Sequence, residues 1–461
     1  MKQVTAIFDI GKTNKKFFLF DANYQEVWRE YTNIKEIIDE DGYPTEDLPG
    51  LSHWLKDLFD RILASEEYDI TAINFSTYGA SMVYLDEHDQ LLTPLYNYTK
   101  PLPKKILEKF KQTYVQDGSF EVATGTPLTP TMLTAGLQLY WLKYEQTEVF
   151  KKVKYALSFP QYLSFLFTGI AVSEYTSIGC HTGLWNYETK DYHQWVYQEQ
   201  LTHILPPIVS AQTSINMTYQ TKRMRIGVGI HDSSAAMLPY LLSDKKPFIL
   251  LSTGTWSIAL NPFNDQPLTK NDLANNCLNY MQVNGERVKA ARFFMGNEYK
   301  IQVEKISHYF KKPYGYHRDI VFNQDIYERL IQQKASRFKF ETIVLKRDSP
   351  GQTSLEHFES FEEAYHQLMI ELIELQTFAL KNVIQKSTIK KIYIDGGFTD
   401  NYIFITLVTY HFSAYKVRTT ISSLGSALGA AMVMSDDKLP KKFLKKNYKM
   451  QKLVPIELVS A

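Results

Sequence analysis

The chain has 461 residues, of which 44% are hydrophobic and 22% charged, a composition typical of globular proteins that excludes a fibrous or wholly disordered chain. Its 51 basic residues nearly balance its 50 acidic residues, so no overall field favours binding to nucleic acid or to a membrane surface. Because one hydrophobic core stops growing at roughly 250 to 300 residues, the length predicts two domains.

Cysteine usage and the N-terminal residues indicate a cytoplasmic protein. Cys180 and Cys277 lie in different halves of the chain without CxxC spacing, so neither a disulfide framework nor a zinc site is indicated. Residues 1–9 resemble a strand and lack the basic head and apolar stretch of a signal peptide. No apolar run approaches the roughly 20 residues that cross a bilayer. We therefore expect neither a membrane nor a nucleic-acid partner.

The first half of the chain opens with strand, tight turn and strand. Apolar residues 5–10 and 17–20 flank the turn sequence GKTN, and residues 25–32 predict a third strand. Leucines recur at helical spacing over residues 49–65, and residues 70–76 predict a further strand. This order is typical of an α/β layer architecture.

The second half opens in the same way. Two apolar runs flank a TGT turn, which is the pattern that a duplicated fold would leave. Residues 244–247 predict a hinge, so we divide the chain into domains at residues 1–244 and 245–461. The other predicted elements are helices within 133–166, 296–310, 361–385 and 425–431, and strands at 248–252, 256–260 and 389–394.

Three turns carry residues suited to phosphoryl transfer, which needs donors that wrap phosphates, a metal ion and a base. In the first turn, glycine lets the backbone approach a phosphate, hydroxyl, amide and lysine groups can donate to it, and the aspartate can hold Mg²⁺. A glycine turn is also common as a plain hairpin. The candidates for nucleotide binding in this first turn are Asp9, Gly11, Lys12, Thr13, Asn14 and Lys16.

Two further turns lie in the second half. Thr253, Gly254 and Thr255 follow one strand, and Gly396 and Gly397 follow another. A diglycine at a strand end is often structural. Neither a Walker GxxxxGK[ST] sequence nor a complete GxGxxG fingerprint occurs, which disfavours the P-loop and Rossmann routes to nucleotide binding.

In these motifs the chain resembles the FGGY carbohydrate kinases, which belong to the superfamily of actin and hexokinase. The first turn is similar to the family's D-x-G-T-T/S phosphate loop, although Lys12 replaces a small residue. The TGT turn is similar to the second phosphate loop, and Gly396, Gly397 and Asn401 are similar to the adenosine motif GGxxxN. The resemblance implies two ribonuclease-H-like domains, an active-site cleft between them, and ATP and Mg²⁺ as cofactors.

The segment GIHDSSA, residues 229–235, is the most specific match. In the family its aspartate is the catalytic base, so the resemblance assigns that role to Asp232 and makes Asp9 and Asp232 the metal-binding residues. A carboxylate within hydrogen-bond distance can accept the proton of an attacking hydroxyl group. The alternative is that Asp232 only caps the following helix.

Several stretches are closest to L-rhamnulose and L-fuculose kinases, among them GTWS, HDSSAA and EYT. A ketose of this kind is therefore the expected acceptor, and the expected enzyme is a phosphotransferase with an alcohol group as acceptor. Asn97 and Tyr98 stand where relatives have an Arg-Asp pair, which puts the exact sugar in question. The expected sugar-binding residues are Thr77, Tyr78, Gly79, Tyr98, His231 and Asp232.

Two alternatives to a sugar kinase share the same fold. One is an actin-like assembly ATPase, for which the HDSSAA segment has no clear purpose. The other is a sugar-binding regulator without catalysis, which the presence of Asp9 and Asp232 disfavours. A homodimer is compatible with the sequence but has no specific signal in it.

Overall fold

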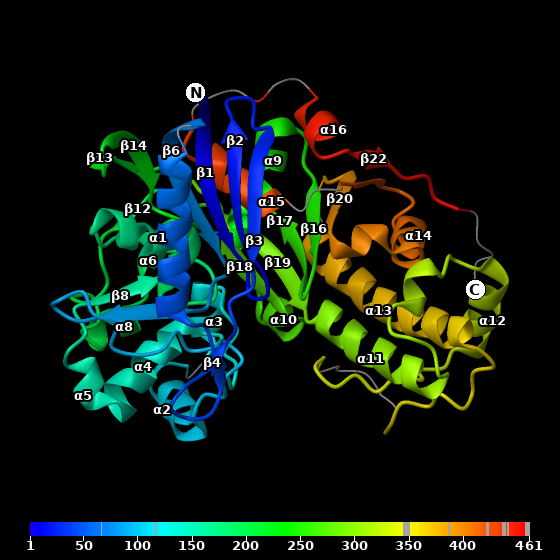
Figure 1. Ribbon diagram of the computed structural model, residues 1–461. Coiled ribbons are helices and arrows are strands. Elements are labelled where there is room, and N and C mark those ends of the chain that lie inside the picture. Colours follow the sequence, from blue (N-terminus) through cyan, green and yellow to red (C-terminus); the bar gives the residue numbers. More distant parts are fainter. Residues whose placement is uncertain are drawn as a thin grey trace.

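A computed structural model gives the fold, and it describes residues 1–65, 67–115, 118–343, 351–385, 388–420, 424–435, 439 and 442–456. Each half of the chain builds one large β-sheet, and helices cover the sheets (Figure 1). The prediction of two α/β domains is therefore confirmed. The boundary at residue 244 stays a prediction.

The first sheet has the strand order β13-β14-β6-β1-β2-β3, and β15 pairs with β6 beside this path. β1, β2 and β3 are antiparallel, whereas β6 runs parallel to β1 and β14 runs parallel to β6. The strands are β1 (Lys2–Ile10), β2 (Lys15–Asp21), β3 (Glu26–Thr32), β6 (Tyr68–Thr77), β13 (Ser214–Tyr219), β14 (Lys222–Gly227) and β15 (Ile230–His231).

The second sheet repeats this connectivity in the order β18-β19-β17-β16-β20-β21-β22. β16 and β17 form a hairpin, β19 pairs antiparallel with β17, and β20 runs parallel to β16. The two predicted openings are thus equivalent. The strands are β16 (Ile249–Thr253), β17 (Ser257–Asn261), β18 (Cys277–Met281), β19 (Arg287–Phe293), β20 (Lys391–Gly396), β21 (Lys416–Thr419) and β22 (Gln451–Lys452).

Helices connect and cover the strands. In the first half they are α1 (Leu48–Ala64), α2 (Lys104–Tyr114), α3 (Ser119–Thr124), α4 (Ala135–Glu145), α5 (Thr147–Phe150), α6 (Phe159–Thr168), α7 (Tyr175–Ile178), α8 (Gln194–Gln198) and α9 (Asp232–Ser243). In the second half they are α10 (Lys270–Ala274), α11 (Met295–Tyr309), α12 (Gln324–Gln333), α13 (Phe361–Ile384), α14 (Tyr402–His411), α15 (Gly425–Met432) and α16 (Phe443–Asn447). None of the described helices is long and apolar enough to span a membrane.

Short strand pairs complete the first half: β4 (Ile37–Ile38) with β5 (Pro44–Thr45), β7 (Met82–Leu85) with β8 (Tyr155–Ser158), β9 (Ser173–Glu174) with β12 (Ile208–Val209), and β10 (Trp185–Asn186) with β11 (Asp191–Tyr192). The stretch 133–166 therefore differs from the helix-only prediction. Pairing of β8 with β7 explains the difference, because that partner lies 70 residues earlier, outside any local pattern.

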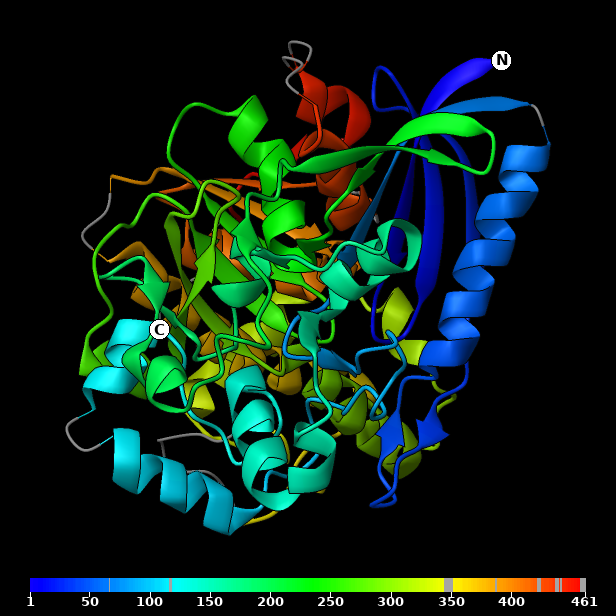
Figure 2. The same ribbon diagram turned by 90° about the vertical axis from the view of Figure 1, so that its left-hand side faces the viewer.

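The first sheet has an apolar layer on each face. Helix α1 runs along one face (Figure 2), where Leu55 and Phe59 share a core with Phe8 and Phe75. Residues of α9 and α15 join Ile7 and other strand residues in a second core. Alternation of side chains along β1 explains this division, since neighbouring residues of a strand point to opposite faces.

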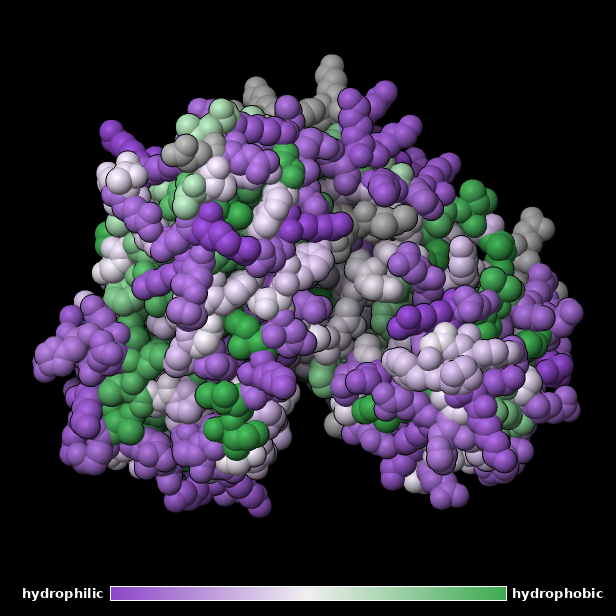
Figure 3. Space-filling model, viewed as in Figure 1, coloured by the Kyte–Doolittle hydropathy of each residue, from purple (hydrophilic) through white to green (hydrophobic). Residues whose placement is uncertain are grey.

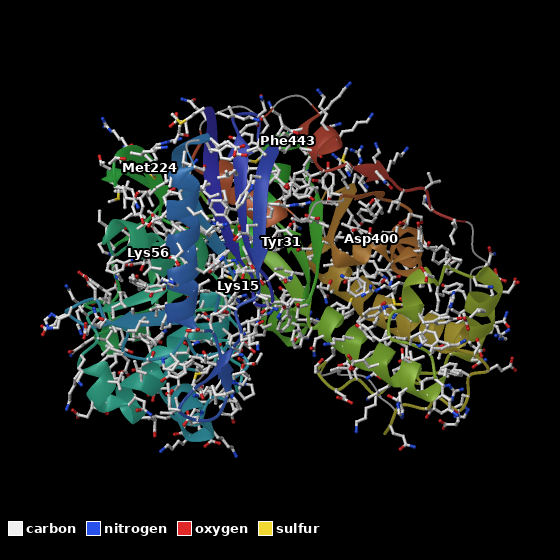
Figure 4. The ribbon with its side chains drawn as sticks, viewed as in Figure 1. Lys15, Tyr31, Lys56, Met224, Asp400 and Phe443 are labelled. Carbon is white, nitrogen blue, oxygen red and sulfur yellow. The ribbon has the colours of Figure 1, made fainter. Side chains whose placement is uncertain are left out.

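The end of the chain returns to the first domain. Helix α15 packs on α9 and contacts β1 and β6. A Cβ atom at Gly429 would lie 1.8 Å from the carbonyl oxygen of Ala235, so only glycine permits this approach of the two helices. Phe443, labelled in Figure 4, packs its ring 6.2 Å from that of Tyr24. The two domains are thus joined by α9 and α15 at their centre.

Candidate active site

The turn between β1 and β2 is closed by a backbone hydrogen bond of 3.0 Å from Gly11 to Asn14. Lys15, at the hairpin end in Figure 4, is buried, donates to the carbonyl oxygens of Gly11 and Lys12, and pairs with Glu46 at 2.6 Å. Lys15 therefore holds the shape of the turn from inside. Its burial leaves the polar tip of the turn exposed.

The two other lysines of this turn have acidic partners. Lys12 forms an ion pair with Glu36, and Lys16 lies 3.7 Å from Asp9. Both were predicted to bind nucleotide, and that role stays a prediction. To bind a nucleotide, Lys12 would have to break its ion pair with Glu36 and contact a phosphate group instead.

Asp9 is the penultimate residue of β1, and its carboxylate is buried. Its Oδ1 atom accepts a hydrogen bond of 2.7 Å from the hydroxyl group of Ser426 on α15. Burial raises the pKa of Asp9, the charge of Lys16 and the Ser426 bond oppose that rise, and the charge of Asp232 adds to it. Asp9 and Asp232 are therefore within electrostatic reach of each other, as a shared cation site requires.

Asp232 is the first residue of α9, and His231 is its N-cap. The backbone N–H of Ser233 donates to Oδ1 of Asp232 at 2.5 Å. The side chain of Asp232 remains 36% exposed, although desolvation in the cleft raises its pKa to about 6. At neutral pH this group is ionised and close to its pKa, which suits a general base.

His231 is buried and neutral, because desolvation lowers its pKa to about 3. Its Nδ1 atom accepts from the backbone N–H of Ser233, so the proton lies on Nε2. No described residue accepts a hydrogen bond from that Nε2 atom. A Cβ atom at Gly79 would lie only 2.4 Å from it, so glycine keeps the space in front of the ring open.

The EYT stretch supports His231 from behind. Glu174 caps α7 and accepts 2.6 Å and 2.8 Å hydrogen bonds from the hydroxyl and backbone groups of Thr176. The Thr176 hydroxyl oxygen in turn accepts from the backbone N–H of His231 at 3.0 Å. These residues position the start of α9.

Aromatic rings border the side of the first domain where sugar binding was predicted. The ring of Tyr78 lies 6.0 Å from that of Tyr98, and its hydroxyl group donates to Glu46. Tyr98 lies beside the side chain of Trp256, which belongs to the second domain. Thr77 donates its hydroxyl group to the backbone oxygen of Tyr78, so it supports the turn from within.

Asn97 has a structural role here. Its amide group donates to the Pro44 carbonyl oxygen at 3.0 Å, and its oxygen accepts from Thr99. Asn97 thus holds a loop in place.

A cavity of about 730 Å³ is lined by some of the predicted nucleotide-binding residues from each half. Thr13 reaches it from the first hairpin, and Asp400, labelled in the second half in Figure 4, lines its other part. The space-filling view is hollowed between the two halves of the molecule (Figure 3). Of the predicted residues, the structure brings together Thr13, Gly254, Thr255, Gly397 and Asn401 around this one cavity.

Glycines shape the cavity in two ways. A Cβ atom at Gly254 or Gly397 would meet no atom within 4 Å, so these backbones face open space. Gly396 has a φ of 94° and a Cβ there would lie 1.8 Å from the carbonyl oxygen of Thr253, so only glycine fits the turn. Gly296, which the sequence did not single out, packs equally closely on Gly254.

Asn401 is a helix cap as well as a lining residue. Its Oδ1 atom accepts from the backbone of Phe404 at the start of α14, and its amide group donates to the Tyr365 hydroxyl at 2.8 Å. Tyr299 and His317 pack beside Tyr365. This end of the cavity is aromatic, which suits a purine ring.

Sequence reasoning missed a cluster at the base of the cleft. Arg292 on β19 donates to Nδ1 of His181 at 3.0 Å, and His181 bonds to the Tyr280 hydroxyl at 3.1 Å. Cys180, His181 and His231 place their ligand atoms within 4.8 Å of one another. Because a guanidinium group already occupies His181, a divalent cation is disfavoured there.

Two β-sheets of equal connectivity around a cavity lined from both halves define the fold class of actin and hexokinase. Residues 4–236 match the model of the FGGY family of carbohydrate kinases, N-terminal domain, and residues 245–326 match carbohydrate kinase FGGY, C-terminal domain. The chain belongs to the FGGY family of carbohydrate kinases.

Two curated relatives are rhamnulokinases. That of Halalkalibacterium halodurans is 25% identical over 258 residues, covering 54% of this chain and 52% of the relative. That of Oceanobacillus iheyensis is 26% identical over 203 residues, covering 41% of each chain. The matched regions thus span about half or less of the relatives' length.

Solved structures share the fold over nearly the whole chain. A carbohydrate kinase from Novosphingobium aromaticivorans is 22% identical with a TM-score of 0.77, covering 99% of this chain and 95% of that one. A ligand-bound xylulose kinase from Lactobacillus acidophilus is 18% identical with a TM-score of 0.80, covering 98% and 94%. At these identities the likeness defines the fold alone.

Proposed function

We propose that this protein transfers the γ-phosphoryl group of ATP to a hydroxyl group of a small sugar. One observation carries the proposal: a cavity of about 730 Å³ is lined by Thr13 from the first turn and by Gly254, Thr255 and Gly397 from the turns of the second half. Family membership supports the same activity. Nucleotide contacts from two domains suit a reaction that must hold the triphosphate while excluding water.

Asp232 would act as the base. Its pKa of about 6 leaves it ionised at neutral pH, so it can accept the proton of the acceptor hydroxyl. The hydroxyl oxygen forms the new bond to the γ-phosphorus as the bond to the β,γ-bridging oxygen breaks. ADP takes the electrons of that broken bond, and the phosphorylated sugar leaves.

The residues present fit a Mg²⁺ site. Asp9 and Asp232 are two carboxylates within electrostatic reach of each other. The charge of Asp232 raises the pKa of Asp9, and a bound cation would oppose that rise. Asp9 and Asp232 would hold the ion, directly or through water. Bound there, Mg²⁺ would neutralise charge on the phosphate oxygens.

The acceptor we propose is a ketose such as L-rhamnulose or L-fuculose. Two relatives bear the name rhamnulokinase, and the stretches GTWS, HDSSAA and EYT support that subgroup. In the cleft, the unpaired Nε2–H of His231 can donate to a sugar oxygen, and Tyr78 offers a ring face.

A coupled ADP-release assay tests the proposal with L-rhamnulose, L-fuculose, D-xylulose, L-ribulose and glycerol as acceptors. We expect ADP release that depends on one of the ketoses and on Mg²⁺. Light scattering with ATP is run in parallel. Filaments without ketose-dependent release would favour an assembly ATPase, and ketose binding without any ADP release would favour a regulator.

A further inference from the structure

Arg292 is a half-buried cation between His181 and Trp256 that has no part in the mechanism above. It lies on β19 of the second sheet, with its guanidinium carbon 5.1 Å from the centre of the Trp256 ring. Its Nη1 atom donates to Nδ1 of His181, a residue of the first domain. Arg292 therefore stands where the two domains meet.

The side chains in contact with Arg292 are neutral. Among the described residues, no carboxylate forms an ion pair with it, and its neighbours Trp256, His181 and Tyr280 are neutral. Burial, followed by the charge of Arg292 itself, lowers the pKa of His181 well below its usual value. A guanidinium group has five N–H donors in a fixed fork. Nη1 of Arg292 is bonded to His181, and the group also forms a hydrogen bond with the Tyr280 side chain, so N–H groups remain for a ligand.

The location of Arg292 is fixed by contacts of its hairpin with the first domain. Ser234 of α9 donates to the Met281 carbonyl oxygen at 2.7 Å, and Tyr187 donates to the Tyr280 carbonyl oxygen at 3.1 Å. Arg287 on the same strand donates to the carbonyl oxygen of Tyr187. The β18–β19 hairpin thus holds Arg292 close to His231 and the start of α9, which pre-organises its donors.

A second hydrogen-bond donor without a described partner, the Nε2–H group of His231, lies near Arg292. The ring of His231 is 5.6 Å from that of Tyr280, and its Nε2–H has no described partner. Buried donors without partners cost free energy, so they indicate that a ligand supplies the oxygens. On the first domain, the side chain of Asn97 is already engaged by Pro44 and Thr99.

We propose that Arg292 is a specificity-determining residue that donates its guanidinium fork to two adjacent oxygens of a neutral ketose, next to the oxygen bound by His231. The inference rests on the proposed function and assigns a sugar contact to the second domain. A planar fork suits two neighbouring oxygens better than a lysine does, since lysine presents a single point of charge. Acceptor recognition is thereby shared between the domains.

The test compares the parent protein with Arg292→Gln and Arg292→Lys. Steady-state kinetics are measured with two epimeric pairs: L-rhamnulose with L-fuculose, and L-ribulose with L-xylulose. Loss of a hydrogen bond to a charged donor predicts an acceptor KM raised about 10- to 100-fold in Arg292→Gln, with the KM for ATP unchanged. The preference within at least one epimeric pair should fall about tenfold, and Arg292→Lys should lie between.

Arg61→Gln is the control, because Arg61 on α1 is an exposed arginine that pairs with Glu30 on β3 and makes none of the contacts that hold Arg292. Thermal unfolding and ATP affinity are measured for every variant. Unchanged ketose KM and epimer preference in a folded Arg292→Gln protein would overturn the inference and leave the proposed function intact. If Arg292→Gln lowered the affinity for ATP as much as the affinity for ketose, the inference would also be overturned, because a purely structural role of Arg292 predicts equal losses. A parent protein without ketose-dependent ADP release would remove the proposed function itself.

Discussion

The hydroxyl group of Ser426 donates a 2.7 Å hydrogen bond to Asp9, and these residues lie 417 positions apart in the chain. This bond attaches α15 to the end of the first strand, beside the carboxylate proposed to hold Mg²⁺. Because hydrogen bonding to a carboxylate favours its ionised form, Ser426 opposes the rise in pKa that burial imposes on Asp9. Helix α15 therefore helps to keep Asp9, at the end of the first strand, ionised.

Ser426→Ala should make activity more sensitive to acid. Without the hydrogen bond the pKa of Asp9 rises further, so the ionised form is lost at a higher pH. In the Ser426→Ala variant we expect the ratio of turnover at pH 6 to turnover at pH 8 to fall roughly fivefold relative to the parent protein. This corresponds to the loss of one hydrogen bond worth about 1 kcal/mol. A pH–rate profile with saturating ATP measures it. Ser413→Ala, at an exposed serine, is the control, and identical profiles would show that Ser426 does not tune Asp9.

Asp232→Asn should lower turnover by about 10² or more, the usual contribution of a positioned base. The fold and ATP affinity should persist, because the cavity residues are unchanged. In the parent protein activity should decline below about pH 6, where Asp232 takes up a proton. The control is Asp57→Asn on exposed α1. Turnover near that of the parent would remove Asp232 from the mechanism.

The same substitution should raise thermal stability at neutral pH. The pKa of Asp232 is about 6 in the folded state against 3.8 as its ordinary value, so the folded protein binds this proton more tightly. Its favourable contribution is fully present below the ordinary pKa and is lost as the pH rises to about 6. Asp232→Asn removes this loss. Melting temperatures should therefore differ more between variant and parent at pH 7.5 than at pH 4, and the reverse order would contradict the assignment.

Gly254→Val should weaken nucleotide binding while the fold persists. A Cβ atom at this position meets nothing within 4 Å, so the valine would extend into the cavity instead of into protein. We expect the KM for ATP to rise about tenfold or more, the effect of roughly 1.4 kcal/mol, with the ketose KM little changed. Gly351→Val, at another glycine with open surroundings, is the control. Equal losses for both substrates would argue against a nucleotide cavity.

Gly429→Ala should destabilise the joint between the domains. The new Cβ would lie 1.8 Å from the carbonyl oxygen of Ala235, which belongs to the backbone and can yield only if the helices separate. Overpacking of this kind costs roughly 1 to 3 kcal/mol in the free energy of unfolding. Urea titration measures the loss. Gly425→Ala in the same helix is the comparison, since its nearest atom is 3.2 Å away on the Asp395 side chain. Equal stability of the two variants would show that the contact is not limiting.

Local sequence patterns were enough to predict the two hairpins, the long helices and the motif residues. Turn residues and alternating apolar residues form patterns over a few neighbouring positions, so they can be recognised in the sequence before the fold is known. For that reason Thr13, Gly254 and Gly397 could be singled out before their common cavity was known. The predicted nucleotide-binding roles of Lys12 and Lys16 depend on the direction of their side chains, which pair with Glu36 and Asp9 in the structure. The motif does not specify that direction.

Contacts between residues far apart in the chain depend on the three-dimensional packing. Arg292 and Ser426 carry no local signal, because their partners His181 and Asp9 lie on the other domain and their roles arise from the packing of two sheets. Strand β8 could not be predicted from the sequence for the same reason, because its hydrogen-bond partner is the distant strand β7. Local patterns fix the elements, whereas burial and charge at the domain junction depend on three-dimensional proximity.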